Sequence, residues 1–252
     1  MAKSPRKSPV AYATHFLSSL AAVYVAPQVS YRMSRYVVRG VLLNEKGVAG
    51  VKGPRQEKFV DFSSEKVEIT ESMSLNFRRD ANVTCPHVNV TGCQVVIKNM
   101  DLCGSITVFR GSLTLVNCRI RAVEGTDESG PLIHGQNGAK IEISKCEFGR
   151  CDYYGVIVEM HSAVTVKDSR FDGLQYVAIG AYLHSSLKVT SCTFNDMNRD
   201  CIRVLERCTG EVVNCQFTGK QERALASSEA DSVIFKRCQV ANCTSSSLSV
   251  CD

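Results

Sequence analysis

Apolar residues alternate with polar ones in short runs along most of the chain, and the runs return at a fixed interval. Each run has two apolar residues two positions apart, a small thiol or hydroxyl residue three positions later, and another apolar residue two further on. The small residue recurs after a step of twenty-eight and then after four steps of twenty-three, at Cys118, Cys146, Ser169, Cys192, Cys215 and Cys238. A second apolar position keeps the step of twenty-three throughout: Ile133, Val156, Ile179, Ile202, Leu225 and Leu248. Alternation with a period of two predicts strands.

A repeat of this length is typical of a solenoid, in which each unit buries its apolar face against its neighbours. Turn-forming residues follow the aromatic position, as at Gly149 and at Asp172-Gly173. No repeat has room for a ten-residue helix beside its strands. The pattern therefore predicts an all-β solenoid and argues against leucine-rich, ankyrin and βαβ arrangements.

The segments SLTLVNCRI, SLKVTSCTF and EVVNCQF resemble repeats of the right-handed parallel β-helix superfamily. This superfamily includes pectate lyases, polygalacturonases, phage tailspikes and noncatalytic intracellular proteins. The resemblance covers roughly residues 67 to 252 and implies a right-handed, single-stranded parallel β-helix of about seven coils, with about 23 residues per coil. It indicates a fold and leaves the activity open, because one fold hosts many functions.

Residues 1 to 60 lack the repeat and are predicted to form a basic arm, an amphipathic capping helix and a lead-in to a β-helix of residues 61 to 252. The helix is predicted from apolar residues at helical spacing: Phe16, Leu17, Leu20, Ala21, Tyr24 and Val25. A basic start followed by an apolar stretch is also a property of secretory signals and mitochondrial presequences, but the capping helix is favoured. A capping helix is compatible with binding a partner.

The net charge of +5 is unevenly placed. Residues 1 to 44 contain no acid and six basic residues: Lys3, Arg6, Lys7, Arg32, Arg35 and Arg39. The remaining 24 basic and 25 acidic residues nearly cancel. The arm is therefore predicted to contact an acidic partner such as tubulin tails or nucleic acid.

The chain has thirteen cysteines, an odd number, and no C-x-x-C motif. Residues one coil apart lie about 4.8 Å from each other in a parallel ladder, so the recurring cysteines form an interior column. A buried thiol packs as a small hydrophobe. We expect free thiols in a reducing intracellular compartment, with disulfides and metal as the alternatives, and no cofactor.

Acidic residues one coil apart would suggest glycoside hydrolysis, which needs two nearby carboxyls. In the regular coils only Glu206 and Glu229 pair in this way. The other stacked charges are opposite and are predicted to be ion pairs on the outer surface: Glu147 with Arg170, Arg199 with Glu222, and Asp200 with Arg223. The polygalacturonase motifs are missing apart from His134-Gly135. The chain is therefore predicted to lack catalytic residues.

Two groups of side chains are candidates for interactions. His161 and His184 are one coil apart and share their column with Arg207, which cannot bind a metal, so a solvated corner stack is favoured over a metal site. Four tyrosines lie on two coils near these histidines: Tyr153, Tyr154, Tyr176 and Tyr182. They form either an exposed patch for sugars or proteins, or ordinary half-buried corner packing.

Two further segments are candidate contacts. The interval from Cys118 to Cys146 exceeds the others by five residues, which predicts a protruding loop at residues 123 to 131 with Glu124, Asp127 and Glu128. The final strand places Leu248 and Val250 in the columns of Leu225 and Ser227, and we expect it to associate with another copy or a foreign cap.

These observations predict a noncatalytic intracellular scaffold that presents protein-binding surfaces within a larger assembly. A carbohydrate-binding or polysaccharide-modifying module is the second interpretation. Attachment to microtubules or axonemes through the basic arm is the third. No uninterrupted apolar run is long enough for a membrane-spanning helix, so no membrane span is expected.

Overall fold

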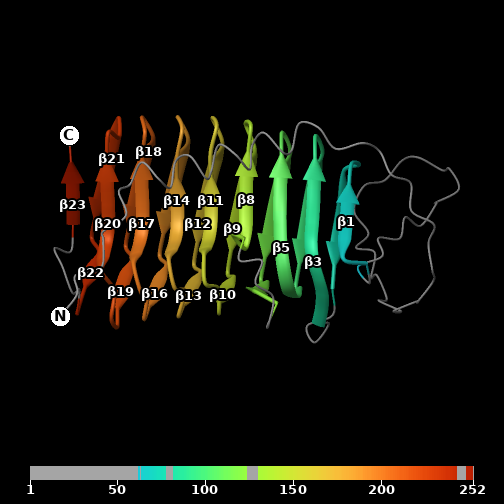
Figure 1. The fold of residues 1–252 in the computed structure, drawn as a ribbon, viewed down its shortest axis with the longest axis horizontal. Coiled ribbons are helices and arrows are strands. Elements are labelled where there is room, and N and C mark those ends of the chain that lie inside the picture. Colours follow the sequence, from blue (N-terminus) through green and yellow to red (C-terminus); the bar gives the residue numbers. More distant parts are fainter. Residues whose placement is uncertain (1–61, 63, 78–81, 124–129, 243–247, 252) are drawn as a thin grey trace, which may run out of the picture. The chain divides into compact units, whose positions relative to one another are not determined.

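The computed structural model describes residues 62, 64–77, 82–123, 130–242 and 248–251. All of them belong to a compact unit within Val37–Asp252. These residues form 23 strands in two parallel sheets and no helix (Figure 1). The all-β prediction is confirmed.

One sheet has fifteen strands and the other has eight. The fifteen-stranded sheet consists of β1 (Lys66–Ile69), β3 (Asn82–Thr91), β5 (Asp101–Phe109), β7 (Arg119–Arg121), β8 (Ile133–Gln136), β10 (Glu147–Gly149), β11 (Tyr154–Val158), β13 (Arg170–Asp172), β14 (Val177–Ala181), β16 (Thr193–Asn195), β17 (Asp200–Leu205), β19 (Gln216–Thr218), β20 (Arg223–Ser228), β22 (Gln239–Val240) and β23 (Leu248–Cys251). The eight-stranded sheet consists of β2 (Met73–Asn76), β4 (Gln94–Lys98), β6 (Ser112–Val116), β9 (Lys140–Ser144), β12 (Ala163–Lys167), β15 (Ser186–Thr190), β18 (Thr209–Val213) and β21 (Ser232–Lys236).

The fifteen-stranded sheet divides at β5, which pairs with β7 through residues 101–103 and with β8 through residues 106–109. Strip 1 continues from β8 through β11, β14, β17 and β20 to β23, and strip 2 continues from β7 through β10, β13, β16 and β19 to β22. Each regular coil therefore contributes one strand to strip 1, one to the eight-stranded sheet and one to strip 2.

The predicted register is confirmed from β8 onward. Val156 pairs with Ile133 on one side and Ile179 on the other, and Leu225 pairs with Leu248. The earlier coils are less regular, since Val95 pairs with Leu113, a step of only eighteen. The step of twenty-three therefore describes the later coils, while the first coils are shorter.

The small residues of the repeat lie inside a corner between the eight-stranded sheet and strip 2. The residue before each one has a positive φ of 48° to 55°, which turns the chain. Each thiol or hydroxyl donates a hydrogen bond to the carbonyl two residues earlier, as in Cys146 to Ser144 (3.2 Å) and Ser169 to Lys167 (2.7 Å). The backbone N–H of Cys146 in turn donates to Oγ of Ser169 in the next coil (3.1 Å). The column therefore satisfies buried backbone groups as well as filling space.

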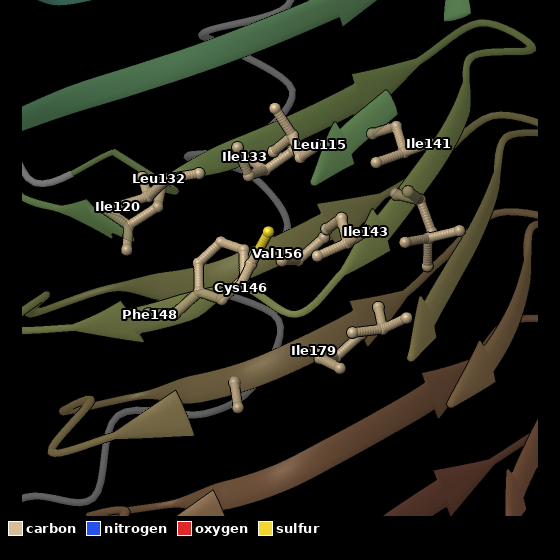
Figure 2. Close-up of a cluster of buried hydrophobic side chains, with 14 of the residues drawn as sticks. Leu115, Ile120, Leu132, Ile133, Ile141, Ile143, Cys146, Phe148, Val156 and Ile179 are labelled. Carbon is tan, nitrogen blue, oxygen red and sulfur yellow. The ribbon is translucent and has the colours of Figure 1, made fainter. Parts of the chain in front are cut away.

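An aromatic ladder lies beside this column. Phe148, Phe171, Phe194 and Phe217 stack with ring centroids 4.7, 5.0 and 4.8 Å apart and planes within 9° of parallel. Figure 2 shows Phe148 and Cys146 among the apolar side chains that fill the interior. Because each ring exposes 2% or less of its surface, the ladder forms a continuous core along the coils.

Several predictions concern residues outside the described ranges. They are the capping helix, the basic arm, the domain boundary near residue 60 and the loop with Glu124, Asp127 and Glu128. The backbone register of Leu248 and Val250 agrees with the expected columns. Association through this strand stays a prediction.

The corner column predicts a sharp difference between two substitutions of Cys192, which is 1% exposed. Cys192→Asp buries an unpaired carboxylate and should cost roughly several kcal/mol of unfolding free energy. Cys192→Ala should cost about 1 kcal/mol, because it leaves only a small cavity. Thermal unfolding of both variants measures the difference, and equal melting temperatures would contradict an interior position.

Candidate functional site

The central strands of strip 1, β11 and β14, are buried on both of their sides. In β11, Val156 and Val158 belong to the core, whereas the intervening Ile157 points away from it. Ile157 nevertheless exposes only 1% of its surface, and every residue of β11 and β14 is buried. The outward face of strip 1 is therefore enclosed at β11 and β14, and this face contains two buried carboxylates.

The first buried carboxylate is Glu159, which directly follows β11 and is 2% exposed. Its Oε1 lies 3.0 Å from Nε2 of His134 and accepts a hydrogen bond of 2.7 Å from the amide of Gln136. Both partners come from β8, one coil earlier. Strand pairing therefore places an imidazole and an amide against this carboxylate.

The protonation of Glu159 follows from these contacts. Burial alone would raise its pKa, because it disfavours the charged form. The hydrogen bond and charge of His134, with the hydrogen bond of Gln136, outweigh burial and hold the pKa of Glu159 below its ordinary value. Glu159 is therefore an ionised hydrogen-bond acceptor near neutral pH.

The second buried carboxylate is Asp200, which is 0% exposed at the start of β17. Arg203 donates to its Oδ2 from Nε (2.9 Å), and Arg223 of the next coil donates to its Oδ1 (2.6 Å). Two guanidinium groups therefore neutralise one carboxylate. The predicted pairing of Asp200 with Arg223 is confirmed. The predicted exposure of Asp200 is wrong, because this carboxylate is buried on the outward face of strip 1.

The other predicted ion pairs have mixed outcomes. Arg199 and Glu222 form the expected exposed pair (3.5 Å). Glu147 and Arg170 face each other in register, but Glu147 contacts Arg119 (2.9 Å) and Arg170 contacts Asp172 (2.7 Å). The Glu147–Arg170 prediction is therefore wrong, because each side chain has a closer partner of opposite charge.

The four tyrosines form one connected cluster between the two carboxylates. Tyr154 makes edge contacts with Tyr153 (4.8 Å), Tyr176 (5.1 Å) and Tyr182 (6.0 Å). The hydroxyls of Tyr154 and Tyr182 are 2.9 Å apart and share a hydrogen bond. Tyr154 is 5% exposed and the other three are half-buried. An open aromatic patch is therefore wrong for Tyr154, and the alternative of half-buried packing describes the cluster.

Arg203 joins the tyrosines to Asp200. Its guanidinium carbon lies 5.1 Å from the ring centre of Tyr176, and its Nη1 donates to the Tyr176 hydroxyl (3.2 Å). Burial raises the pKa of Tyr182 to about 12, although the charge of Arg203 opposes the shift. Tyr182 is therefore a neutral hydrogen-bonding group at physiological pH.

A glycine makes room for this cluster. A Cβ atom at Gly180 would lie 2.7 Å from Cε2 of Tyr182 and 3.4 Å from Cε1 of Tyr154. The two rings therefore lie directly over the backbone of β14. The repeat spacing in the sequence does not reveal this contact. A tyrosine side chain is long enough to lie over residues outside its own column.

The predicted histidine stack is confirmed. His161 and His184 are exposed, with ring centroids 5.2 Å apart and planes 13° from parallel. Two parallel rings cannot both direct a nitrogen lone pair, which lies in the ring plane, at one ion between them. No cluster of three metal-binding side chains occurs in the described ranges. Glu206 and Glu229 lie exposed at the same corner.

Glu159 and Arg203 were not among the residues singled out from the sequence. The sequence signal for Glu159 is that both alternating sets of residues are mostly apolar or small in its segment GVIVEM and in VAIGAY of the next coil. This pattern indicates strands buried on both faces. A charged residue next to such a strand needs an internal partner.

Glu159 should make a pH-dependent contribution to stability. Because its pKa is lowered in the folded state, this contribution is present above the unfolded value of about 4.3 and is lost as the pH falls through the folded value. Glu159→Gln removes a charge-assisted hydrogen bond and should cost about 1.5–3 kcal/mol at pH 6.

Urea unfolding of both proteins between pH 6 and strongly acidic pH measures this difference. It should shrink as the solution is acidified, and the exposed control Glu206→Gln should cause little change at any pH. A cost for Glu159→Gln that stays constant down to low pH would contradict an ionised Glu159.

The comparisons with known proteins support the fold. No curated protein matches the chain. No membrane-spanning helix occurs among the residues that the structure describes. A family model for a right handed beta helix region matches residues 84–245, which is more than half of the 252 residues and most of the described coils. The chain therefore belongs to the right-handed β-helix family, and its solenoid is a right-handed parallel β-helix.

Proposed function

We propose that this protein is a noncatalytic scaffold that binds another protein through the outward face of strip 1. The observation that carries the proposal is the Tyr–Arg cluster on this face, in which each ring and guanidinium is fixed by its neighbours. Side chains that are already ordered lose little conformational entropy on binding. Tyrosine and arginine are also enriched among the residues that dominate interface energies.

The surface available to a partner is the exposed part of this cluster. Tyr153 and Tyr176 stack with centroids 5.8 Å apart, and both rings are half-buried. The side chain of Arg203 is 15% exposed and that of His134 is 18% exposed. A partner that covers these groups gains apolar contact with the rings and hydrogen bonds from their polar edges.

The two carboxylates support a binding role over hydrolysis. A general acid in glycoside hydrolysis needs a raised pKa so that it remains protonated. Glu159 has the opposite shift, and Asp200 is enclosed by two arginines. Both carboxylates therefore stabilise the arrangement of side chains on the outward face of strip 1.

Carbohydrate binding is the second candidate. The parallel Tyr153 and Tyr176 rings, with a hydrogen-bonding imidazole on the same strip, form a surface on which a sugar ring can stack. The fold family is compatible with this role and with protein binding.

Two further proposals concern location and the arm. The corner cysteines Cys118, Cys146, Cys192 and Cys215 are free thiols buried in the core, which supports a reducing intracellular compartment. The basic residues of positions 1 to 44 provide a second contact for an acidic partner such as tubulin tails or nucleic acid.

Affinity isolation of the tagged chain, followed by mass spectrometry, tests the proposal. Tyr176→Ser removes a ring from the cluster and should weaken recovery of the protein partner about thirtyfold, as expected for a central interface residue. Val96→Ser is the matched control, because Val96 is a half-buried apolar residue on β4, in the other sheet. Unchanged melting temperatures would show that both variants remain folded.

The alternatives give different results in the same experiment. Retention on polysaccharide without any protein partner would favour the carbohydrate candidate. Loss of the partner only after deletion of residues 1 to 44 would place binding on the arm. Equal recovery by wild type and Tyr176→Ser would contradict binding through strip 1.

A further inference from the structure

The stack of Tyr153 and Tyr176 has a cation at one of its ends. The guanidinium carbon of Arg203 lies 5.1 Å from the ring centre of Tyr176. Tyr176 is in turn parallel to Tyr153, with planes 8° apart and ring centroids separated by 5.8 Å. Tyr153 comes from the coil before Tyr176, and Arg203 comes from the coil after it. The internal cation therefore covers the Tyr176 end of the stack.

The other end of the stack, at Tyr153, borders open space. Gly130 occupies the position one coil before Tyr153, because Ile133 pairs with Val156. Gly130 is exposed, and a Cβ atom built on it would meet no described atom within 4 Å. A glycine therefore stands where a side chain would otherwise cover the second face of the Tyr153 ring.

The two buried carboxylates of strip 1 differ in their cationic partners. Asp200 contacts two guanidinium groups, whereas Glu159 contacts an imidazole and an amide. An amide is neutral, and an imidazole carries a charge only when it is protonated. Burial raises the pKa of Tyr153, with further contributions from Tyr176 and from the charge of Glu159. The negative charge of Glu159 therefore acts at the Tyr153 end of the stack.

We propose that the protein partner of strip 1 places an arginine guanidinium on the open face of Tyr153, where the charge of Glu159 attracts it. Aromatic ring faces attract cations, and the planar guanidinium stacks well on them. Arg203 makes the same kind of contact with Tyr176 inside the protein. This inference rests on the binding role proposed for strip 1 and specifies the partner as a protein with an exposed arginine.

Titration of the purified full chain with the peptide acetyl-Gly-Arg-Gly-amide tests the proposal, with tyrosine ring signals followed by NMR. The arginine peptide should bind saturably. The matching citrulline peptide has a side chain of the same shape without the charge, and it should bind about tenfold more weakly. Added salt should weaken binding of the arginine peptide.

Two variants locate the contact. Tyr153→Leu removes the ring, whereas Gly130→Leu fills the open space and leaves Tyr153 and Glu159 in place. Each should reduce binding of the arginine peptide to the level of the citrulline peptide. Phe109→Leu is the matched control, because Phe109 is a half-buried ring of β5 whose face already carries Arg110 (5.2 Å). This control should bind like the wild type, and melting temperatures should show that all variants are folded.

Equal binding of the two peptides would overturn the proposal, as would an arginine peptide that binds both Tyr153→Leu and Gly130→Leu as it binds the wild type. If Tyr176→Ser still loses the protein partner in that case, strip 1 remains the binding face and only the guanidinium position is wrong. If Tyr176→Ser also recovers the partner like the wild type, the binding face itself is wrong.

Discussion

The hydrogen bonds inside the corner between the eight-stranded sheet and strip 2 determine the repeat of this solenoid. At each corner one residue with positive φ turns the chain, and the next residue must be small enough to point inward. Its thiol or hydroxyl donates to a backbone carbonyl of the same coil, and Oγ of Ser169 also accepts from the N–H of the coil before. An added residue within a strand between corners would reverse the direction in which the following side chains face.

This register has a consequence for the outer surface. Because strip 1 stacks its strands in the same order as the other faces, residues of adjacent coils meet on its outward side at strand spacing. Glu159 meets His134 and Gln136, and Asp200 meets Arg223. The regular stacking of the coils thus brings together side chains that do not follow the repeat, and these side chains form the binding face that we propose.

The repeat made much of the fold predictable from the sequence. The spacing of the cysteine column and of the column from Ile133 to Leu248 predicted both the coil and its register. In a parallel solenoid, residues one repeat apart in the sequence are neighbours in adjacent coils. The exposure of Asp200 and the partner of Glu147 were predicted wrongly. Strand register determines which backbone segments lie opposite each other. A long charged side chain, however, can form an ion pair with any of several neighbouring residues. The site was therefore only partly predictable: the tyrosines were found, and the groups that hold them were not.

Stability of two variants at Ser169 tests the role of the corner most directly. Ser169→Cys keeps an atom that can accept from Cys146 and donate to Lys167, so its free energy of unfolding should lie within about 0.5 kcal/mol of the wild type. Ser169→Ala leaves the buried N–H of Cys146 without its partner and should lose about 1–3 kcal/mol. Urea unfolding of the three proteins measures both values. A Ser169→Ala variant as stable as the wild type would contradict the claim that the column satisfies the backbone of the corner.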